Sequence, residues 1–282
     1  MTSNRLIALL AALAAFSPVT ALAGPIQDNS FLLEEAYNQE AGVIQHISAF
    51  NRSRETGAWT YSFTEEWPVG GQTHQASVTF NYADLRVPNG RGTGDTLLNY
   101  RWQAVGSGET PVAFAPRLSA VLPTGNAKVG LGTGSVGVDV NLPLSVALSD
   151  RLVSHVNLGG RYVPGASTEL GSATVASFTV GQSFIWLAHQ NLNFMVEAVY
   201  SSTEIDARDA HSRSESLTVN PGLRAAINIG GLQVVPGIAV PIGVGPSHGD
   251  TGLFFYLSLE HPFRLAGPTD EEASAQLPGK RG

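Results

Sequence analysis

Strict alternation of apolar and polar side chains dominates the chain between residues 43 and 263. Successive side chains of a β-strand point to opposite faces, so a strand between two different environments alternates in polarity. The run from residue 136 to residue 148 keeps an aliphatic side chain at every second position. Eleven further segments are strand-like: 43–50, 59–66, 74–82, 97–104, 112–122, 152–162, 178–186, 192–201, 217–229, 232–242 and 253–263. In segment 43–50 alone, the two faces are ambiguous.

A soluble β-sandwich also has alternating strands, but two features favour a membrane barrel. Charges lie on the face that carries small and polar residues, and the apolar face is almost free of charge, with Glu65 as the exception. Several strands are longer than the five or six residues usual in globular proteins. Aromatic residues lie near strand ends, as in an interfacial girdle: Trp59, Tyr82, Trp102, Tyr162, Trp186 and Tyr200. We therefore predict an all-β protein whose residues 41–263 form an antiparallel transmembrane β-barrel of about twelve strands.

The connectors between these strands alternate in length. The short ones are 68–73, 106–110, 149–151, 188–191 and 230–231, and the longer ones are 83–94, 123–134, 164–171, 203–215 and 245–250. Outer-membrane barrels have short periplasmic turns and longer outer loops. Twelve strands with both termini in the periplasm place every short turn on the periplasmic side.

Both ends of the chain differ from this pattern. Residues 1–23 have a basic start at Arg5, a short apolar run and an A-x-A site, which predicts a secretory signal peptide. Residues 24–40 form a segment that either lies in the periplasm or plugs the lumen, with a short helix expected over 31–37 after Asn29 and Ser30. Residues 264–282 form a polar tail that we expect to be disordered. The predicted location is the outer membrane of a Gram-negative bacterium.

Composition excludes several classes of function. The net charge is −7, with 16 Lys and Arg residues against 23 Asp and Glu residues, so no nucleic-acid partner is expected. The chain has no cysteine, which excludes disulfides and thiol nucleophiles. We expect no cofactor and no metal. The expected partners are outer-membrane lipids, small-molecule solutes and, through a last strand that ends on Phe263, the barrel assembly machinery.

Several short motifs place this barrel near a known family. They are Gly94-Asp95, Ala115-Pro116-Arg117-Leu118, Leu122-Pro123-Thr124-Gly125, Gly130-Leu131-Gly132-Thr133-Gly134 and Asn157-Leu158-Gly159. In these motifs the chain resembles the outer-membrane proteins grouped with the meta-pathway of phenol degradation. The resemblance implies a transporter-like barrel for aromatic or other small hydrophobic compounds, and it implies no catalytic residues.

Three motifs invite other interpretations. Residues 132–137 fit the dinucleotide pattern G-x-G-x-x-G, but a loop precedes them and a strand follows. Acidic residues in 203–215 could form a calcium loop, although Arg208 and Arg213 dilute the charge. The turn at 149–151 pairs residues whose numbers add to 300, which sets Ser145 across from His155 as a conceivable nucleophile and base. No oxyanion hole accompanies them, and we predict that the protein is not an enzyme.

The polar face of the strands lines the lumen of the predicted barrel. Its candidate lumen-lining residues are Arg101, Arg117, Asp139, His155, Arg161, Glu197, Arg224 and Glu260. Charges of both signs argue against strong ion selectivity. The function expected first is an outer-membrane channel or transporter for small molecules, aromatic or hydrophobic ones among them. The alternatives are a structural or surface-interaction barrel without transport and, third, a lipid-modifying membrane enzyme.

Overall fold

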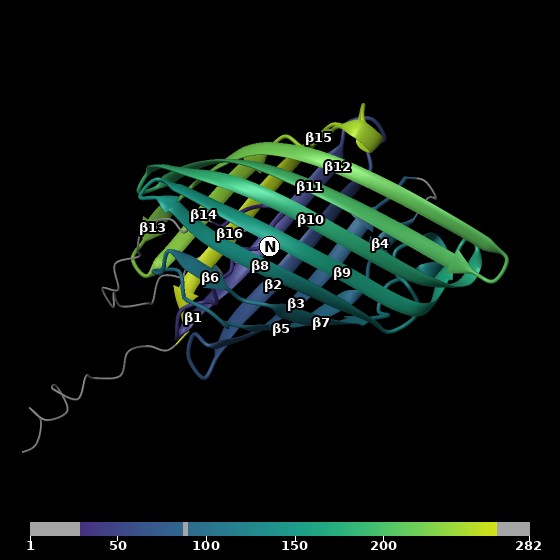
Figure 1. Cartoon of the computed structure of the whole chain (residues 1–282), viewed down its shortest axis with the longest axis horizontal. Helices are drawn as coiled ribbons and strands as arrows, with labels where there is room; N and C mark the ends of the chain where they lie inside the picture. The colour runs from purple at the N-terminus through teal and green to yellow at the C-terminus, as the bar shows by residue number, and fades with distance from the viewer. Residues whose placement is uncertain (1–28, 87–89, 264–282) are drawn as a thin grey trace, which may run out of the picture.

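The computed structural model describes residues 29–86 and 90–263, which form a closed antiparallel barrel of 12 strands (Figure 1). The predicted signal peptide and the polar tail lie outside the described residues. The strand segments are β1 (Val43–Ser53), β2 (Trp59–Val69), β3 (His74–Asp84), β4 (Arg91–Thr93), β5 (Thr96–Trp102), β6 (Val112–Phe114), β7 (Arg117–Leu122), β8 (Gly137–Ser149), β9 (Leu152–Thr168), β10 (Gly171–His189), β11 (Leu192–Ala207), β12 (Ala210–Ala225), β13 (Ile227–Ile229), β14 (Leu232–Ala239), β15 (Ile242–Gly243) and β16 (Gly252–Pro262). Two short 3-10 helices lie in loops, η1 (Ala127–Val129) and η2 (Gly245–Ser247).

Sixteen segments make twelve spans because four spans are interrupted. Each interrupted span consists of two consecutive segments: β4 and β5, β6 and β7, β12 and β13, or β14 and β15. Pro116 separates β6 from β7, and Pro241 separates β14 from β15. Proline lacks the N–H that a strand ladder needs, so it breaks a strand at these points. The first and last spans pair antiparallel, with Phe50 opposite Phe255, and this pairing closes the barrel.

The register predicted from the turn lengths is confirmed. Asp139 faces Arg161 and Ser145 faces His155 across the β8–β9 pair. The turn at Gly230 and Gly231 pairs Ile229 with Leu232, as expected. Its type differs from the type I′ turn that the two glycines suggest. Gly230 has a φ of 60° but Gly231 does not have a left-handed φ, which is the pattern of a type II′ turn.

The two faces of the wall have opposite polarity. The outer face exposes aliphatic and aromatic side chains, including Val138, Leu158, Phe178, Val180 and Phe255. The inner face buries polar side chains, including Gln45, Asn141, His155, Asn157, Ser183, Asn193 and Asn220. A protein in water would bury the first set and expose the second. This inside-out arrangement fits a wall with lipid outside and a polar interior. Among the described residues, no helix is long and apolar enough to cross a bilayer.

The prediction of outer loops is wrong for two segments. Residues 164–171 and 203–215 continue the strands, so that β9 to β12 are 16 to 19 residues long and extend beyond the other strands at one end (Figure 1). Cross-strand pairs account for the second of these hairpins. Glu204 faces Arg213 and Asp206 faces His211, and each pair is in salt-bridge contact. These acidic side chains therefore pair across a hairpin, and the described residues contain no cluster that could hold a metal ion.

Face assignment leads to a first prediction, on adjacent residues of β10. Val180 is exposed on the outer face, and Thr179 lies on the inner face next to Gly159. We expect Val180→Arg to lower the free energy of unfolding by about 2–4 kcal/mol, because it places a charge in lipid. Thr179→Arg points into the polar lumen and should cost much less. Urea unfolding in lipid vesicles measures both, and equal losses would contradict the assignment.

The outer loops near the closing pair of spans are joined by one carboxylate. Glu55 accepts hydrogen bonds from the Thr251 hydroxyl at 2.7 Å and from its backbone N–H at 2.8 Å. These bonds lower the pKa of Glu55 from 4.5 to about 2, and the bond from the hydroxyl has the largest effect. A lowered pKa means that the contact stabilises the fold fully above about pH 4.5 and is lost as the pH falls toward 2.

This contact gives a second prediction. The carboxyl carbon of Glu55 should titrate near pH 2 in an NMR titration of the folded protein. Thr251→Val removes the hydroxyl and keeps the backbone N–H, so the midpoint should rise toward 4.5 without reaching it. The same midpoint in both proteins would show that the loops do not hold this contact in solution.

Candidate functional site

Residues 29–40, here called the plug segment, lie inside the barrel and run along its inner wall. Their contacts follow the wall from β11 through β9, β8 and β5 to β3, after which the chain enters β1. Asn29, Ser30, Leu33 and Ala36 are buried. The segment therefore crosses the lumen by following successive strands in the reverse of their order in the sequence.

The helix expected over residues 31–37 is not formed. The backbone N–H groups of Phe31, Leu32 and Leu33 all donate to one carboxylate oxygen of Glu197, at 3.1, 2.8 and 3.2 Å. The other oxygen of Glu197 accepts from the side-chain amide of Asn220 at 2.8 Å. A buried carboxylate needs donors, and these N–H groups supply them in place of water. The N–H of Ala36, which a helix would direct to the carbonyl of Leu32, donates to Ser145 of the wall instead.

Wall side chains bind the remaining backbone of the segment in the same way. Asn157 accepts from the N–H of Glu34 at 2.9 Å and donates to its carbonyl at 2.8 Å. Ser145 accepts from the N–H of Ala36 at 2.8 Å. Further along, the side chain of Gln103 accepts from the N–H of Asn38 and donates to the carbonyl of Ala36, and Gln75 accepts from the N–H of Gln39. Because amide side chains offer both a donor and an acceptor, they can replace a neighbouring strand.

Glycines in the wall make room for two apolar side chains of the plug segment. A Cβ atom at Gly181 would lie 2.5 Å from Leu33, and one at Gly222 or Gly237 would lie 2.7 or 2.6 Å from the ring of Phe31. The ring also lies 5.3 Å from the ring centres of Phe254 and Tyr256. Any larger residue at these glycines would displace the segment, so the wall is shaped to hold it.

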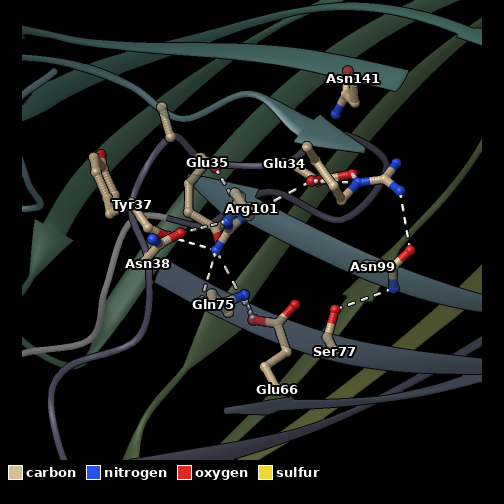
Figure 2. A network of polar contacts seen from close by, with 12 residues as sticks. Glu34, Glu35, Tyr37, Asn38, Glu66, Gln75, Ser77, Asn99, Arg101 and Asn141 are labelled. Carbon is tan, nitrogen blue, oxygen red and sulfur yellow. Dashed lines mark hydrogen bonds and ion pairs between the residues drawn. The ribbon is translucent and has the colours of Figure 1, made fainter. Parts of the chain in front are cut away.

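Arg101 lies at the centre of a polar network between β5 and the plug segment (Figure 2). Its guanidinium donates to the side chain of Asn38 at 3.0 Å and to the carbonyls of Tyr37 at 2.6 Å and Glu35 at 3.3 Å. Three carboxylates surround it within 4 Å, those of Glu34, Glu35 and Glu66. A buried charge is stable only when it is paired and hydrogen-bonded, and the plug segment supplies most of these partners.

Three other predicted lumen residues form a chain of ion pairs. Asp139 contacts Arg117 and Arg161, each at 3.0 Å, and Arg117 contacts Glu34 of the plug segment at 2.9 Å. Asp139 and Arg161, which the turn at 149–151 sets opposite each other, therefore form an ion pair. The sequence pattern does not predict that Arg117 joins these ion pairs. Its partner Glu34 lies in the plug segment, whose contacts the pattern does not reveal.

The remaining candidates lie on the inner wall in separate places. Glu260 accepts from the side chain of Gln45 at 2.6 Å, and Gln45 in turn contacts Gln39. Arg224 is buried, with its guanidinium 5.8 Å from the ring centre of Tyr256. The eight residues thus lie in separate groups, and the plug segment contacts four of them directly: Arg101, Arg117, His155 and Glu197.

The predicted contact of Ser145 with His155 is present, at 2.6 Å between the hydroxyl oxygen and Nδ1. Both side chains are buried, and the Ser145 hydroxyl also accepts from the N–H of Ala36. The ring of His155 packs edge-on against Tyr37. In this arrangement the pair is part of the wall that holds the plug segment.

A cavity lies on each side of the plug segment along β9. Val153 lines one of about 360 Å³, together with Tyr37 and Leu187. Arg161 lines the other, of about 310 Å³, together with Leu97 and Leu131. Asn157 lies between them on the strand and holds Glu34. The plug segment therefore separates an inner cavity from an outer one.

Comparison with known proteins places the fold. Neither a family model nor a curated protein matches the chain. The COG4313 outer membrane channel from Pseudomonas putida F1 aligns with a TM-score of 0.62 and 11% identity, over 80% of this chain and 97% of that one. The β domain of the Bordetella autotransporter BrkA aligns with a TM-score of 0.44 and 15% identity, over 80% of this chain and 100% of that one. The Pseudomonas putida toluene transporter TodX gives 0.38 and 8%, over 88% and 98%.

The likeness to the first of these structures shows the fold alone, which is that of a closed antiparallel β-barrel. The phenol-degradation grouping that the loop motifs resemble stays a prediction, since no family model matches. The motif residues share a structural task. Asp95 accepts from the N–H of Gly125 at 3.0 Å and from the N–H of Thr133 at 2.8 Å, and so fastens loop 123–134 at the outer cavity.

The ion pairs of the lumen give a third prediction. Arg161→Gln should lower the free energy of unfolding by about 1 kcal/mol or less, because Arg161 is 38% exposed and its pair is screened by water. Arg117→Gln should cost about 3 kcal/mol, because it leaves Glu34 and Asp139 without their shared, less exposed partner. Urea unfolding of the two variants compares them, and the reverse order would contradict the assigned network.

Proposed function

We propose that this protein is an outer-membrane channel for small molecules whose lumen is closed by the plug segment in the state described. The observation that carries the proposal is the position of that segment inside the barrel, where it binds Asn157 of β9 between a cavity lined by Val153 and a cavity lined by Arg161. Solutes pass when the segment withdraws from the wall. The proposal includes export to the outer membrane with removal of residues 1–23, and assembly through the last strand.

The contacts of the plug segment support reversible closure. They are hydrogen bonds and ion pairs between the segment and wall side chains, and the segment is not paired as a strand of the barrel. The wall groups it leaves can bind water that enters with a solute. The barrel spans pair with one another, and these strand pairings do not include the segment.

Small aromatic or hydrophobic solutes are the class to test first. The resemblance of the loop motifs favours this class. The outer cavity also combines apolar Leu97 and Leu131 with the partly exposed guanidinium of Arg161. Charges of both signs in the lumen favour neutral or weakly charged molecules over strong ion selectivity.

A structural barrel without transport is the second candidate function. The dense hydrogen bonding of the plug segment favours it, because a permanent seal would need the same contacts. The two functions differ in one property, which is whether the segment leaves the wall.

A reversible crosslink tests this, and it is the fourth prediction. Ser30 and Ser183 meet at 2.7 Å between their hydroxyl oxygens, and the native chain has no cysteine. Ser30→Cys with Ser183→Cys should form a disulfide that locks the plug segment to β10. We expect the oxidised protein to lose solute uptake into liposomes and single-channel openings, and reduction to restore both.

Two controls complete this experiment. Ser183→Cys alone should be insensitive to oxidant. Deletion of residues 29–40 should raise the conductance above that of the reduced double variant, because it empties the middle of the lumen. If the deletion variant folds as a barrel and is still electrically silent and impermeable, the channel proposal fails and the sealed barrel is preferred.

A further inference from the structure

The ring of Phe31 occupies an apolar site within an otherwise polar lumen. Buried Phe254 and Tyr256 flank the ring, and the same cluster contains Ala226, Val235 and Ala239. Ile47 and Ala49 of β1 also pack against it. We call this place the ring site. It is one of two apolar clusters among the described buried residues, and the other contains Ala36, Ala113 and Ala115, with Tyr37 packed against it.

Two glycines of the wall lie next to the Phe31 ring in the ring site. Gly222 on β12 and Gly237 on β14 lie beneath opposite edges of the Phe31 ring, close to its Cε2 and Cε1 atoms. A methyl group at either position would overlap the ring. The absence of a side chain at these two positions therefore leaves the space that the Phe31 ring occupies.

The ring and the backbone of the plug segment are held by different parts of the wall. The Glu197 carboxylate binds the backbone N–H groups of residues 31–33, and these bonds do not involve the ring. The ring site binds only the side chain. A molecule that presents a ring can therefore compete with the Phe31 side chain without first breaking the Glu197 contacts.

We propose that the ring site binds the aromatic ring of a small solute in exchange with Phe31, and that this exchange releases the plug segment. The proposal rests on the channel function proposed above and assigns the group that opens it. Phe31 lies near the start of the plug segment, at the end away from β1. Loss of the ring contact thus removes the apolar part of the contacts that hold this end to the wall.

Thermodynamics limits how the exchange works. A solute shifts the equilibrium of the segment only by as much as it binds the state with an empty ring site more tightly than the state in which Phe31 fills the site. In the native chain the solute must compete with Phe31, so its apparent affinity is reduced by the fraction of time for which the site is empty. Removing the Phe31 ring should remove this competition.

The test compares variants that keep the backbone of the plug segment. Phe31→Ala empties the ring site, and we expect fluorophenol to bind this variant about tenfold more tightly than the native protein, as measured by ¹⁹F NMR in detergent micelles. Phe31→Ala with Gly237→Ala places a methyl group in the emptied site. We expect the double variant to lose this gain, and fluorocyclohexane, which is not planar, to show little preference among the three proteins.

Channel recordings form the second arm. Fluorophenol should raise the opening frequency of the native protein with increasing concentration. Phe31→Ala should open more often without solute and respond less to it. Phe31→Leu, which keeps an apolar side chain of similar length, should lie between the two.

Each outcome decides the proposal. Equal binding of fluorophenol to Phe31→Ala and to the double variant would overturn it, whatever the channel recordings show. Tighter binding to Phe31→Ala, with opening that does not depend on solute, would overturn the exchange step. Failure of the channel function is distinguished by the deletion variant, because ring binding is read by NMR and needs no conductance.

Discussion

The unpaired backbone of an extended segment inside a barrel is the constraint on which this structure depends. Every N–H and C=O group withdrawn from water must find another partner. The plug segment cannot pair with a strand edge, because the closed barrel has none to offer. The partners are wall side chains instead, above all Glu197, Asn157, Ser145, Gln103 and Gln75. This explains why the inner wall is rich in amides, hydroxyls and carboxylates, although a water-filled lumen would need no particular set of them.

The charges of the lumen follow from the same constraint. Arg101 and Arg117 come from neighbouring spans and would repel each other if Glu34 did not lie between them. Asp139 then links Arg117 to Arg161 on the outer side. The segment and the wall therefore neutralise each other, and neither is electrostatically complete alone. The mixed signs in the sequence reflect this mutual pairing.

Much of the fold could be predicted from the sequence, because alternation is a local property. Twelve spans, their faces and the β8–β9 register follow from the polarity pattern and the turn lengths. The faces of segment 43–50 could not be assigned, because Ile47 and Ala49 pack against the same buried cluster as Phe31, which local pattern does not reveal. The contacts of the plug segment join residues far apart in the sequence, such as Phe31 and Glu197, which are 166 positions apart, so no spacing rule could find them. Residues 164–171 and 203–215 were assigned to loops because their composition is polar, but outside the bilayer a strand can be polar on both faces.

The unequal lengths of the strands give the barrel a rim of unequal height. With 19 residues at ~3.3 Å each, β10 is long enough to cross a bilayer core of ~30 Å and extend well past it, whereas β1 has 11 residues. The tips of the tall hairpins, at Glu169 and Asp209, are exposed and make no contact with the plug segment among the interactions described. A foreign peptide inserted at either tip would therefore lengthen a hairpin in the aqueous phase and leave the lumen as it is. The tall side of the rim is thus a place where the protein can carry new sequence without altering what lies inside.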